Sequence, residues 1–324
     1  MTLHINETEV RSVLTMAIAL EAVEDSLRKQ SRGEVVVQPR RRFELPNGFY
    51  HYMAAADYPA GFIAEKQYTY VAGKIRFLVL LYEIATGDLL ALMEADYMGQ
   101  QRTGAASGVA TKFLARSDAR VAAIIGTGGQ ARTQLEAVAG VRKLESARAY
   151  GRDVARREKF CSDMAQRLDL PVYAAASAAE AINGAAIVCT ATTASHPVVT
   201  AADIAPGMHI NAIGANHAHK RELDEAAVNR ADVITVDSIE QSQQEAGDLI
   251  IAFGKDDSRW SSVKELADIV DGKIPGRSND QQVTIFKSNG IASWDLAVAV
   301  KVLALAREKG LGRALPLWTG TPGA

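Results

Sequence analysis

The sequence predicts an α/β protein of two parts, in which one domain is inserted into another. From Val121 to Ser238, short apolar runs alternate with helix-like segments, which is typical of a parallel sheet with crossover helices. Residues 34–96 are instead rich in aromatic and β-branched residues, which indicates an α+β domain with a mostly antiparallel sheet. A long apolar helix near the end returns to that first domain. The predicted domains are therefore 1–117 with 292–324, and 118–291.

The elements of the first domain follow from local patterns. Residues 7–32 place apolar side chains at helical spacing and stop at Gly33, which predicts one helix. The runs FYHYMAAA, GFIAEKQYTY and KIRFLVLLYEIATGDLLALMEA predict strands, with a hairpin turn at Thr86-Gly87-Asp88. A helix follows from about Tyr97 to Ala115, with small residues that permit close packing.

The inserted domain contains the predicted strands VAAIIG, SARAYG, AAIVCTAT, MHINAIG and VITVDS. After it, IASWDLAVAVKVLALAREKGLG has the periodicity of an amphipathic helix that ends at Gly310. The final TGTPGA is expected to be a loose tail.

Composition excludes several classes of function. The net charge is −2, with 36 Lys and Arg against 38 Asp and Glu, so no basic excess is available for nucleic acid. The polar start MTLHINETEVRSVL does not resemble a signal peptide, and no apolar run has membrane-spanning length. Cys161 and Cys189 lie in apolar or helical sequence and are expected to be reduced, buried thiols. We expect a cytoplasmic protein without a membrane partner.

The segment GTGGQA has the spacing G-x-G-x-x-A between a predicted strand and a predicted helix. In such a turn the first glycine permits the tight bend, the second lets the backbone approach a pyrophosphate, and the alanine allows close helix packing. The phosphates would lie on amides at the helix N-terminus. The predicted cofactor-binding residues of this turn are Gly126, Thr127, Gly128, Gly129, Gln130 and Ala131.

The end of the next predicted strand bears on which dinucleotide binds. An NAD site usually has an acid there to hold the ribose hydroxyls. This chain has Gly151 followed by Arg152, which leaves room and positive charge for a 2′-phosphate, while Asp153 follows one place late. The segment is also consistent with a solvated loop. The prediction is NAD(P), with NADP favoured.

Three cations of the first domain would suit a small anionic substrate: Arg42, Lys66 and Arg102. Lys66 interrupts an aromatic strand, so its side chain either extends to water or binds a ligand or donates a proton. In the inserted domain, Asn216, His217 and His219 follow a predicted strand whose carboxyl end would face a ligand. His-x-His has no evident third ligand, so solvated histidines are expected and no metal.

Several segments together resemble the ornithine cyclodeaminase/μ-crystallin family. They are EKQYTY, GDLLALMEADYMGQQRTGAASGVATKFLA, IIGTGGQA, INAIGANHAHKREL and TIFKSNGIASWDLAVA. The last, and the R-T-x-A-A-S helix, are more specific than a glycine motif. The resemblance implies a homodimer formed through the first domain's sheet, a nicotinamide cofactor, and hydride transfer at the α-carbon of a small amino or imino acid.

The resemblance also implies roles for individual residues. Arg42 and Arg102 would bind the substrate carboxylate, while Lys66 would hold it and act in proton transfer. Ile213 would place its backbone near the nicotinamide. Further residues fall in segments that line the cofactor pocket of the family: Thr103, Thr190, Ala191 and Ser288.

One departure separates the branches of the family. Cyclodeaminases have an aspartate in the catalytic loop, where this chain has Gly214-Ala215-Asn216. Asparagine can hydrogen-bond but cannot accept a proton as a carboxylate does. The predicted function is therefore an NAD(P)-dependent imino-acid reductase, reversible as an amino-acid dehydrogenase, with Lys66 and Asn216 as catalytic residues. The alternatives are an ornithine cyclodeaminase-type ammonia lyase and a non-catalytic crystallin-like carrier of NADP or a small ligand.

Overall fold

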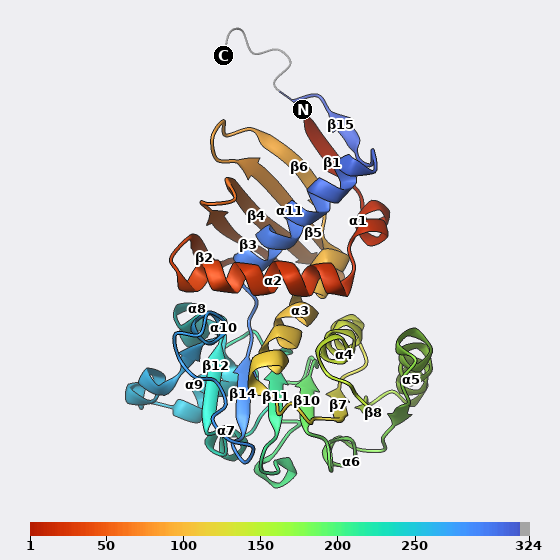
Figure 1. Ribbon diagram of the computed structural model, residues 1–324, viewed down its shortest axis with the longest axis vertical. Helices are drawn as coiled ribbons and strands as arrows, with labels where there is room; N and C mark the ends of the chain where they lie inside the picture. The colour runs from red at the N-terminus through yellow and green to blue at the C-terminus, as the bar shows by residue number, and fades with distance from the viewer. Residues whose placement is uncertain (318–324) are drawn as a thin grey trace. The chain divides into compact units, whose positions relative to one another are not determined.

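The computed structural model describes residues 1–317, which form two compact units (Figure 1). Unit 1 comprises Met1–Arg102 and the chain from Ile291, and unit 2 comprises Thr103–Gly290. The division lies inside helix α3 (Asp96–Leu114), whereas the sequence prediction placed it after that helix. The predicted fold class is confirmed, because an α/β unit is inserted into an α+β unit. The predicted tail lies outside the described residues.

Unit 1 is built on a seven-stranded sheet in the order β15-β1-β6-β5-β4-β3-β2. Its strands are β1 (Thr2–Ile5), β2 (Val35–Leu45), β3 (Gly48–Asp57), β4 (Phe62–Val71), β5 (Lys74–Glu83), β6 (Leu89–Glu94) and β15 (Arg313–Leu315). Strands β2 to β6 pair antiparallel, and β1 adds parallel to β6. The sheet is therefore mixed, and the sequence prediction missed β1, β2 and β15.

Helices α2 (Met16–Ser31) and α11 (Ala292–Glu308) lie side by side and pack on this sheet (Figure 1). The single helix predicted for residues 7–32 is wrong, because the segment forms α1 (Glu7–Val13) and then α2. Leu14 is extended, and the Thr15 hydroxyl accepts a hydrogen bond from Ile18 N, so a new helix N-terminus begins there. Helical periodicity on both sides hid this break.

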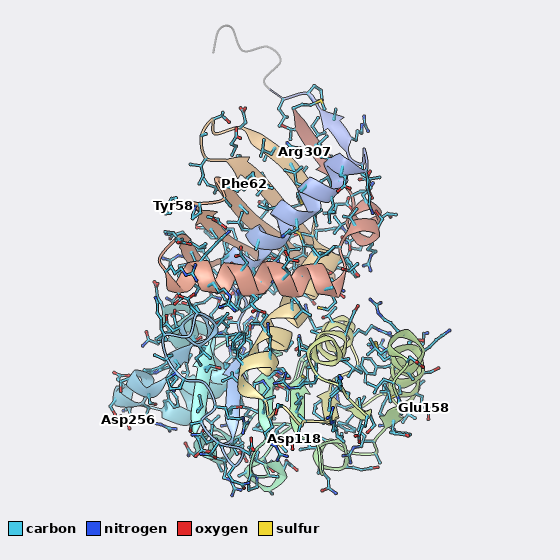
Figure 2. The ribbon with its side chains drawn as sticks, in the orientation of Figure 1. Tyr58, Phe62, Asp118, Glu158, Asp256 and Arg307 are labelled. Carbon is cyan, nitrogen blue, oxygen red and sulfur yellow. The ribbon has the colours of Figure 1, made fainter. Side chains whose placement is uncertain are left out.

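The turns of the sheet follow local chemistry. The predicted hairpin is confirmed: β5 ends at Glu83, β6 begins at Leu89, and Gly87 has the positive φ of +75° that the turn requires. Tyr58 and Phe62 lie at the turn between β3 and β4 (Figure 2).

Unit 2 is an eight-stranded parallel sheet in the order β13-β12-β14-β11-β10-β7-β8-β9. The strands are β7 (Val121–Ile125), β8 (Ser146–Tyr150), β9 (Val172–Ala174), β10 (Ile187–Thr190), β11 (His209–Ala212), β12 (Val233–Val236), β13 (Lys264–Glu265) and β14 (Thr284–Lys287). The helices are α4 (Gly129–Val141), α5 (Val154–Leu168), α6 (Ala178–Ile182), η1 (Ala201–Asp203), α7 (Glu225–Asn229), α8 (Ile239–Glu245), α9 (Gly247–Phe253), η2 (Asp257–Ser262) and α10 (Leu266–Val270).

Two apolar cores cover the two faces of this sheet. Neighbouring residues of β7 alternate between them: Ile124 packs with α4 and α5, and Ile125 packs with α6, α7 and α9. A parallel sheet buried on both faces explains why its strands are continuous apolar runs. The strand order reverses between β7 and β10, so the carboxyl ends of these strands form a topological switch point.

The cysteine prediction is confirmed, because Cys161 and Cys189 are free and buried. Burial raises the pKa of the Cys189 thiol to about 12. Among residues 1–317, no helix has the length and apolar character that a membrane span requires.

Candidate active site

The glycine turn of unit 2 lies at the switch point. Gly126 has φ +116°, and a Cβ there would meet the carbonyl of Ala191, so β7 and β10 approach closely only because this residue is glycine. Gly128 is the N-cap of α4, and a Cβ at Gly128 would have no neighbour within 4 Å. Ala131 is fully buried against the sheet. The turn therefore presents open space at the amino end of a thirteen-residue helix, where a pyrophosphate fits.

The end of β8 has no room for a side chain at Gly151, because a Cβ would lie 2.6 Å from Thr127 Oγ1. Asp153 is the N-cap of α5, and its carboxylate accepts a hydrogen bond from Arg156 N at 2.9 Å. Arg152 is exposed, and Arg157 Nη1 donates to the Gly151 carbonyl at 3.1 Å. The acid here caps a helix, and arginines surround the strand end.

The other predicted cofactor-binding residues occupy the same edge of the sheet, with one exception. Thr190 ends β10 and is followed by Ala191, Ile213 follows β11, and Ser288 follows β14. Thr103 lies instead in α3, half-buried. Thr127, Gly129 and Gln130 complete the turn before and into α4.

The loop after β11 contains Asn216, which is half-buried. His217 Nδ1 donates to Asn216 Oδ1 at 2.9 Å, because an amide oxygen can only accept. His217 and His219 have ring centroids 5.5 Å apart. Within residues 1–317, no group of three His, Cys, Asp or Glu residues is arranged to hold a metal ion.

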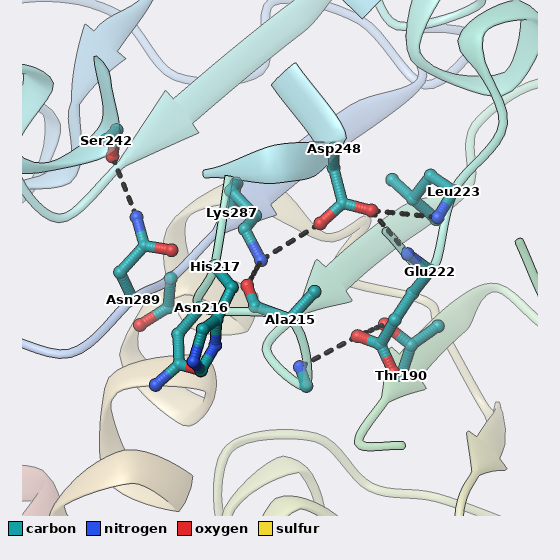
Figure 3. Close-up of polar contacts among 12 residues, drawn as sticks. Thr190, Ala215, Asn216, His217, Glu222, Leu223, Ser242, Asp248, Lys287 and Asn289 are labelled. Carbon is teal, nitrogen blue, oxygen red and sulfur yellow. Dashed lines mark hydrogen bonds and ion pairs between the residues drawn. The ribbon is translucent and has the colours of Figure 1, made fainter. Parts of the chain in front are cut away.

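Sequence reasoning missed Glu222, which lies in the same loop region and is fully buried. Its carboxylate accepts hydrogen bonds from Thr190 Oγ1 at 2.6 Å and from Gly214 N at 2.7 Å (Figure 3). No motif isolates this residue, because KREL reads as a solvated charged run until its partners are known.

In unit 1, Lys66 and Arg102 bind one carboxylate. Lys66 Nζ lies 2.8 Å from Asp295 Oδ1, and Arg102 Nε lies 3.1 Å from the same oxygen. All three side chains are at least nine-tenths buried. Arg102 Nη1 and Asp295 Oδ2 are buried with no hydrogen-bond partner among residues 1–317. Buried polar atoms of this kind indicate that a polar ligand completes the cluster.

The same cluster includes Arg40, which is 7% exposed and approaches Met53 Sδ at 4.0 Å. Met53 pairs with Lys66 across β3 and β4, so Arg40 lies level with Lys66. Arg42 lies two residues further along β2, where its Nε donates to Nε2 of His51, its partner residue on β3, at 2.6 Å. Arg42 stays a predicted carboxylate ligand outside this cluster, and the sequence did not point to Arg40 or Asp295. Asp295 lies in a segment with the pattern of an apolar helix, but no local pattern indicates that it pairs with Lys66.

Burial changes the acidity of Lys66. Desolvation lowers the pKa of its ammonium to about 8, because the Asp295 carboxylate only partly offsets burial and the nearby charges of Arg102 and Arg40 lower it further. The Phe77 ring lies 5.4 Å from Lys66 Nζ, and Gly99 leaves space beside it that a Cβ would occupy at 3.1 Å. Lys66 can therefore exchange a proton near neutral pH.

The chain is similar to a known protein family over nearly its whole length. The model of the ornithine cyclodeaminase/mu-crystallin family matches residues 2–310. A Δ1-pyrroline-2-carboxylate reductase from Bacillus cereus is 38% identical over 242 residues, covering 74% of each chain. The Thermococcus litoralis Δ1-pyrroline-2-carboxylate reductase in complex with NADH and L-proline superposes with a TM-score of 0.93 at 36% identity, covering 97% of this chain and 100% of that one.

An archaeal alanine dehydrogenase dimer with bound NAD superposes with a TM-score of 0.92 at 32% identity, covering 98% of this chain and 99% of that one. These proteins match both units rather than the dinucleotide-binding unit alone. The chain belongs to the ornithine cyclodeaminase/mu-crystallin family.

Proposed function

We propose that this chain reduces a small imino acid to the amino acid with a nicotinamide cofactor, and that Lys66, Arg102 and Arg40 bind the substrate carboxylate. It is an NAD(P)-dependent oxidoreductase that acts on C=N and CH–NH groups. The observation that supports the substrate class is the buried cluster in unit 1. Two cations share one oxygen of Asp295, a third lies beside them, and Arg102 Nη1 has no partner among residues 1–317. A carboxylate satisfies that donor and the excess positive charge.

The residues of unit 1 orient the substrate and move a proton. The cations fix the carboxylate, which places the neighbouring C=N carbon in one position. When bound, the reduced nicotinamide supplies a hydride to that carbon. The nitrogen takes its proton from Lys66 Nζ or from a water held by Asn216, which gives the amine. With its pKa near 8, Lys66 is partly protonated at neutral pH and serves either direction.

NADP is the cofactor that this proposal favours. Asp153 caps α5 and is thereby engaged away from a ribose, while Arg152 and Arg157 bring positive charge to the end of β8. A 2′-phosphate needs such charge. The solved relatives contain NADH and NAD, so the preference of this chain is a point on which it would differ from them.

The partner in the proposed assembly is a second copy of the chain. On the sheet of unit 1, Phe43 is 56% exposed and stacks on Tyr50 and Tyr52 at 6.0 and 5.9 Å between ring centroids. Ile63, on β4, is also exposed. These residues alternate with the buried ones beneath α11, so they form the opposite face of the sheet. A broad apolar and aromatic face of this kind suits a homodimer.

The test measures oxidation of the reduced cofactor, which is monitored through the loss of its near-ultraviolet absorbance. NADH and NADPH are each offered Δ1-pyrroline-2-carboxylate, its six-membered homologue, and pyruvate or oxaloacetate with an amine. Turnover with at least one imine is expected. No turnover, with ammonia released from ornithine in the absence of added reductant, would establish a cyclodeaminase. Cofactor binding without any turnover would establish a carrier.

A further inference from the structure

A single buried carboxylate connects two strand-end segments of unit 2, one after β10 and one after β11. Glu222 Oε2 accepts hydrogen bonds from Thr190 Oγ1 at 2.6 Å and Gly214 N at 2.7 Å. Glu222 Oε1 accepts from Thr192 N and Thr192 Oγ1, both at 2.7 Å. Four donors therefore surround one side chain that water does not reach. Figure 3 shows the contact with Thr190. The set of donors matches an ionised carboxylate, which accepts at both oxygens.

The segment held by Glu222 lies between the glycine turn and the loop that contains Asn216. On one side, a Cβ on Gly126 would meet the Ala191 carbonyl. On the other side, a Cβ on Gly214 would meet Thr192 backbone atoms and Glu222 itself. Residues 190–192 therefore contact both turns, and Glu222 bonds this segment directly to the second turn, at Gly214. Glu222 fixes the spacing between them.

A second buried pair holds Glu222 in place. Asp248 Oδ1 accepts hydrogen bonds from the backbone N of Glu222 at 2.6 Å and of Leu223 at 2.9 Å. Asp248 Oδ2 lies 3.0 Å from Lys287 Nζ, which also donates to the carbonyl of Ala215 (Figure 3). Lys287, at the end of β14, thus holds Ala215, the residue between Gly214 and Asn216. Two neighbouring residues of that loop, Gly214 and Ala215, are therefore held by buried charged side chains.

We infer that Glu222 is a positioning residue for hydride transfer, which sets the Ile213–Asn216 loop against the segment 190–192. This inference rests on the proposed placement of the cofactor along the carboxyl ends of β7, β10 and β11. Glu222 does not touch the reacting atoms in this account. It acts through Thr190, Thr192 and Gly214.

Glu222→Gln is the sharpest change, because it keeps the shape and removes the charge. One of its two ends becomes an NH2 group, which must face donors that it cannot accept from. Burial raises the pKa of Glu222, and the donors of Thr190 and Thr192 oppose that rise. A displaced loop misaligns the hydride donor and acceptor, and such misplacement lowers kcat by about 100-fold. The phosphate-binding turn keeps its own glycines, so cofactor affinity should change by less than about threefold.

A matched pair of threonines supplies the second variant and its control. Thr190→Val removes one donor to Glu222 without changing shape. Thr235→Val removes a buried hydroxyl of the same sheet that donates to the Ile285 carbonyl at 3.0 Å, away from Glu222. Thr190→Val should lower kcat by about tenfold. Thr235→Val should leave kcat unchanged, whatever its effect on stability.

The experiment measures four quantities on the full chain. They are kcat, the dissociation constant of NADPH from its fluorescence, the deuterium isotope effect with 4-deuterated NADPH, and amide hydrogen exchange of residues 190–217 with NADPH bound. In Glu222→Gln we expect a larger isotope effect and faster exchange in this segment, at nearly full cofactor occupancy. If that variant does not fold, Thr190→Val gives the same comparison.

Two results would overturn the inference. One is a loss of kcat in proportion to cofactor occupancy, with the isotope effect unchanged, because that describes a smaller folded fraction. The other is unchanged exchange in residues 190–217. Hydrogen exchange needs no substrate, so it separates a failure of this inference from a failure of the proposed function. If NADPH does not protect this segment in the unaltered chain, the proposed cofactor placement is wrong instead.

Discussion

At the scale of single residues, the cluster around Lys66 shows how burial produces reactivity. A lysine in water stays protonated well above neutral pH, whereas the buried Lys66 has its pKa lowered to about 8. Asp295 keeps it from falling further, because its Oδ1 lies 2.8 Å from the ammonium. The same carboxylate also binds Arg102, so it holds two cations in fixed positions. One acid thereby fixes the positions of both the proposed proton donor and the proposed substrate ligand.

This acidity predicts opposite pH dependences for the two directions of the reaction. As the pH rises through about 8, Lys66 loses the proton it would donate, so kcat/KM for imine reduction should fall and kcat/KM for amino-acid oxidation should rise. Lys66→Arg should flatten both profiles near that pH, because a guanidinium stays protonated, and should lower activity by about 100-fold. The check is a pH series of initial rates.

The control for that series is Lys74→Arg, at an exposed lysine of β5. It should reproduce the profile of the unaltered chain. A profile of Lys66→Arg that still breaks near pH 8 would show that another group titrates, and Lys66 would then have no part in proton transfer.

A second residue-scale prediction separates Arg40 from Arg42. Arg40 is buried level with Lys66, whereas Arg42 lies two residues further along β2 and donates to His51 of β3. Arg40→Met should raise KM for the imino acid by about tenfold or more, because it removes a charged ligand of a carboxylate. Arg42→Met should raise it less. Steady-state kinetics at saturating cofactor measure the two KM values. A larger increase in Arg42→Met than in Arg40→Met would assign binding of the substrate carboxylate to Arg42.

At the scale of elements, the proposed preference for NADP depends on the end of β8. The strand stops at Tyr150, Gly151 packs on Thr127, and α5 begins behind Asp153, so Arg152 is the first side chain that extends outward. Arg152→Ser should lower kcat/KM for NADPH by about tenfold or more, and that for NADH by less than about twofold. Parallel assays with the two cofactors measure this. Equal losses would mean that Arg152 does not distinguish a 2′-phosphate.

Strand β11 gives a prediction about stability. His209 is fully buried between Thr284 Oγ1 at 2.9 Å and Asn211 Oδ1 at 3.2 Å. Desolvation, reinforced by Arg277, lowers its pKa from 6.5 to about 3. Between these values the unfolded chain binds a proton that the folded chain does not, so the free energy of unfolding falls as the pH falls.

The loss from His209 amounts to at most about 1.4 kcal/mol for each pH unit below 6.5. Urea denaturation at several pH values measures the slope. His209→Asn should make it shallower, whereas His196→Asn, at an exposed histidine, should change it little. Equal slopes for the two variants would exclude His209 as the source.

At the scale of the whole molecule, the proposed dimer depends on the uncovered face of the unit 1 sheet. Phe43→Glu places a charge among stacked Tyr50 and Tyr52 and should convert a dimer to a monomer, since a buried unpaired charge is costly. Sedimentation velocity measures the change. Val154→Glu, at an apolar residue of α5 that is similarly exposed at 53%, should leave the assembly intact. A dimer that survives Phe43→Glu would place the interface elsewhere.

The sequence by itself determined the class of fold and the glycine turn, and it pointed to Lys66 and Arg102 as candidate site residues. These depend on local patterns: strand and helix periodicity, the spacing of glycines, and a cation in an aromatic strand. Local patterns also failed in places, since continuous helical spacing hid the break at Leu14 and Thr15 between α1 and α2.

Only the tertiary structure decided which partners these residues have. An extra residue in β2, between Gln38 and Arg41, shifts the register and turns Arg40 toward the Lys66 cluster. Asp295 pairs with Lys66, which lies 229 residues away in the sequence. Glu222 accepts a hydrogen bond from Thr190 at the end of β10, 32 residues away. Strand register and helix packing depend on the whole chain at once. Burial then sets the pKa of each group, and burial exists only after folding.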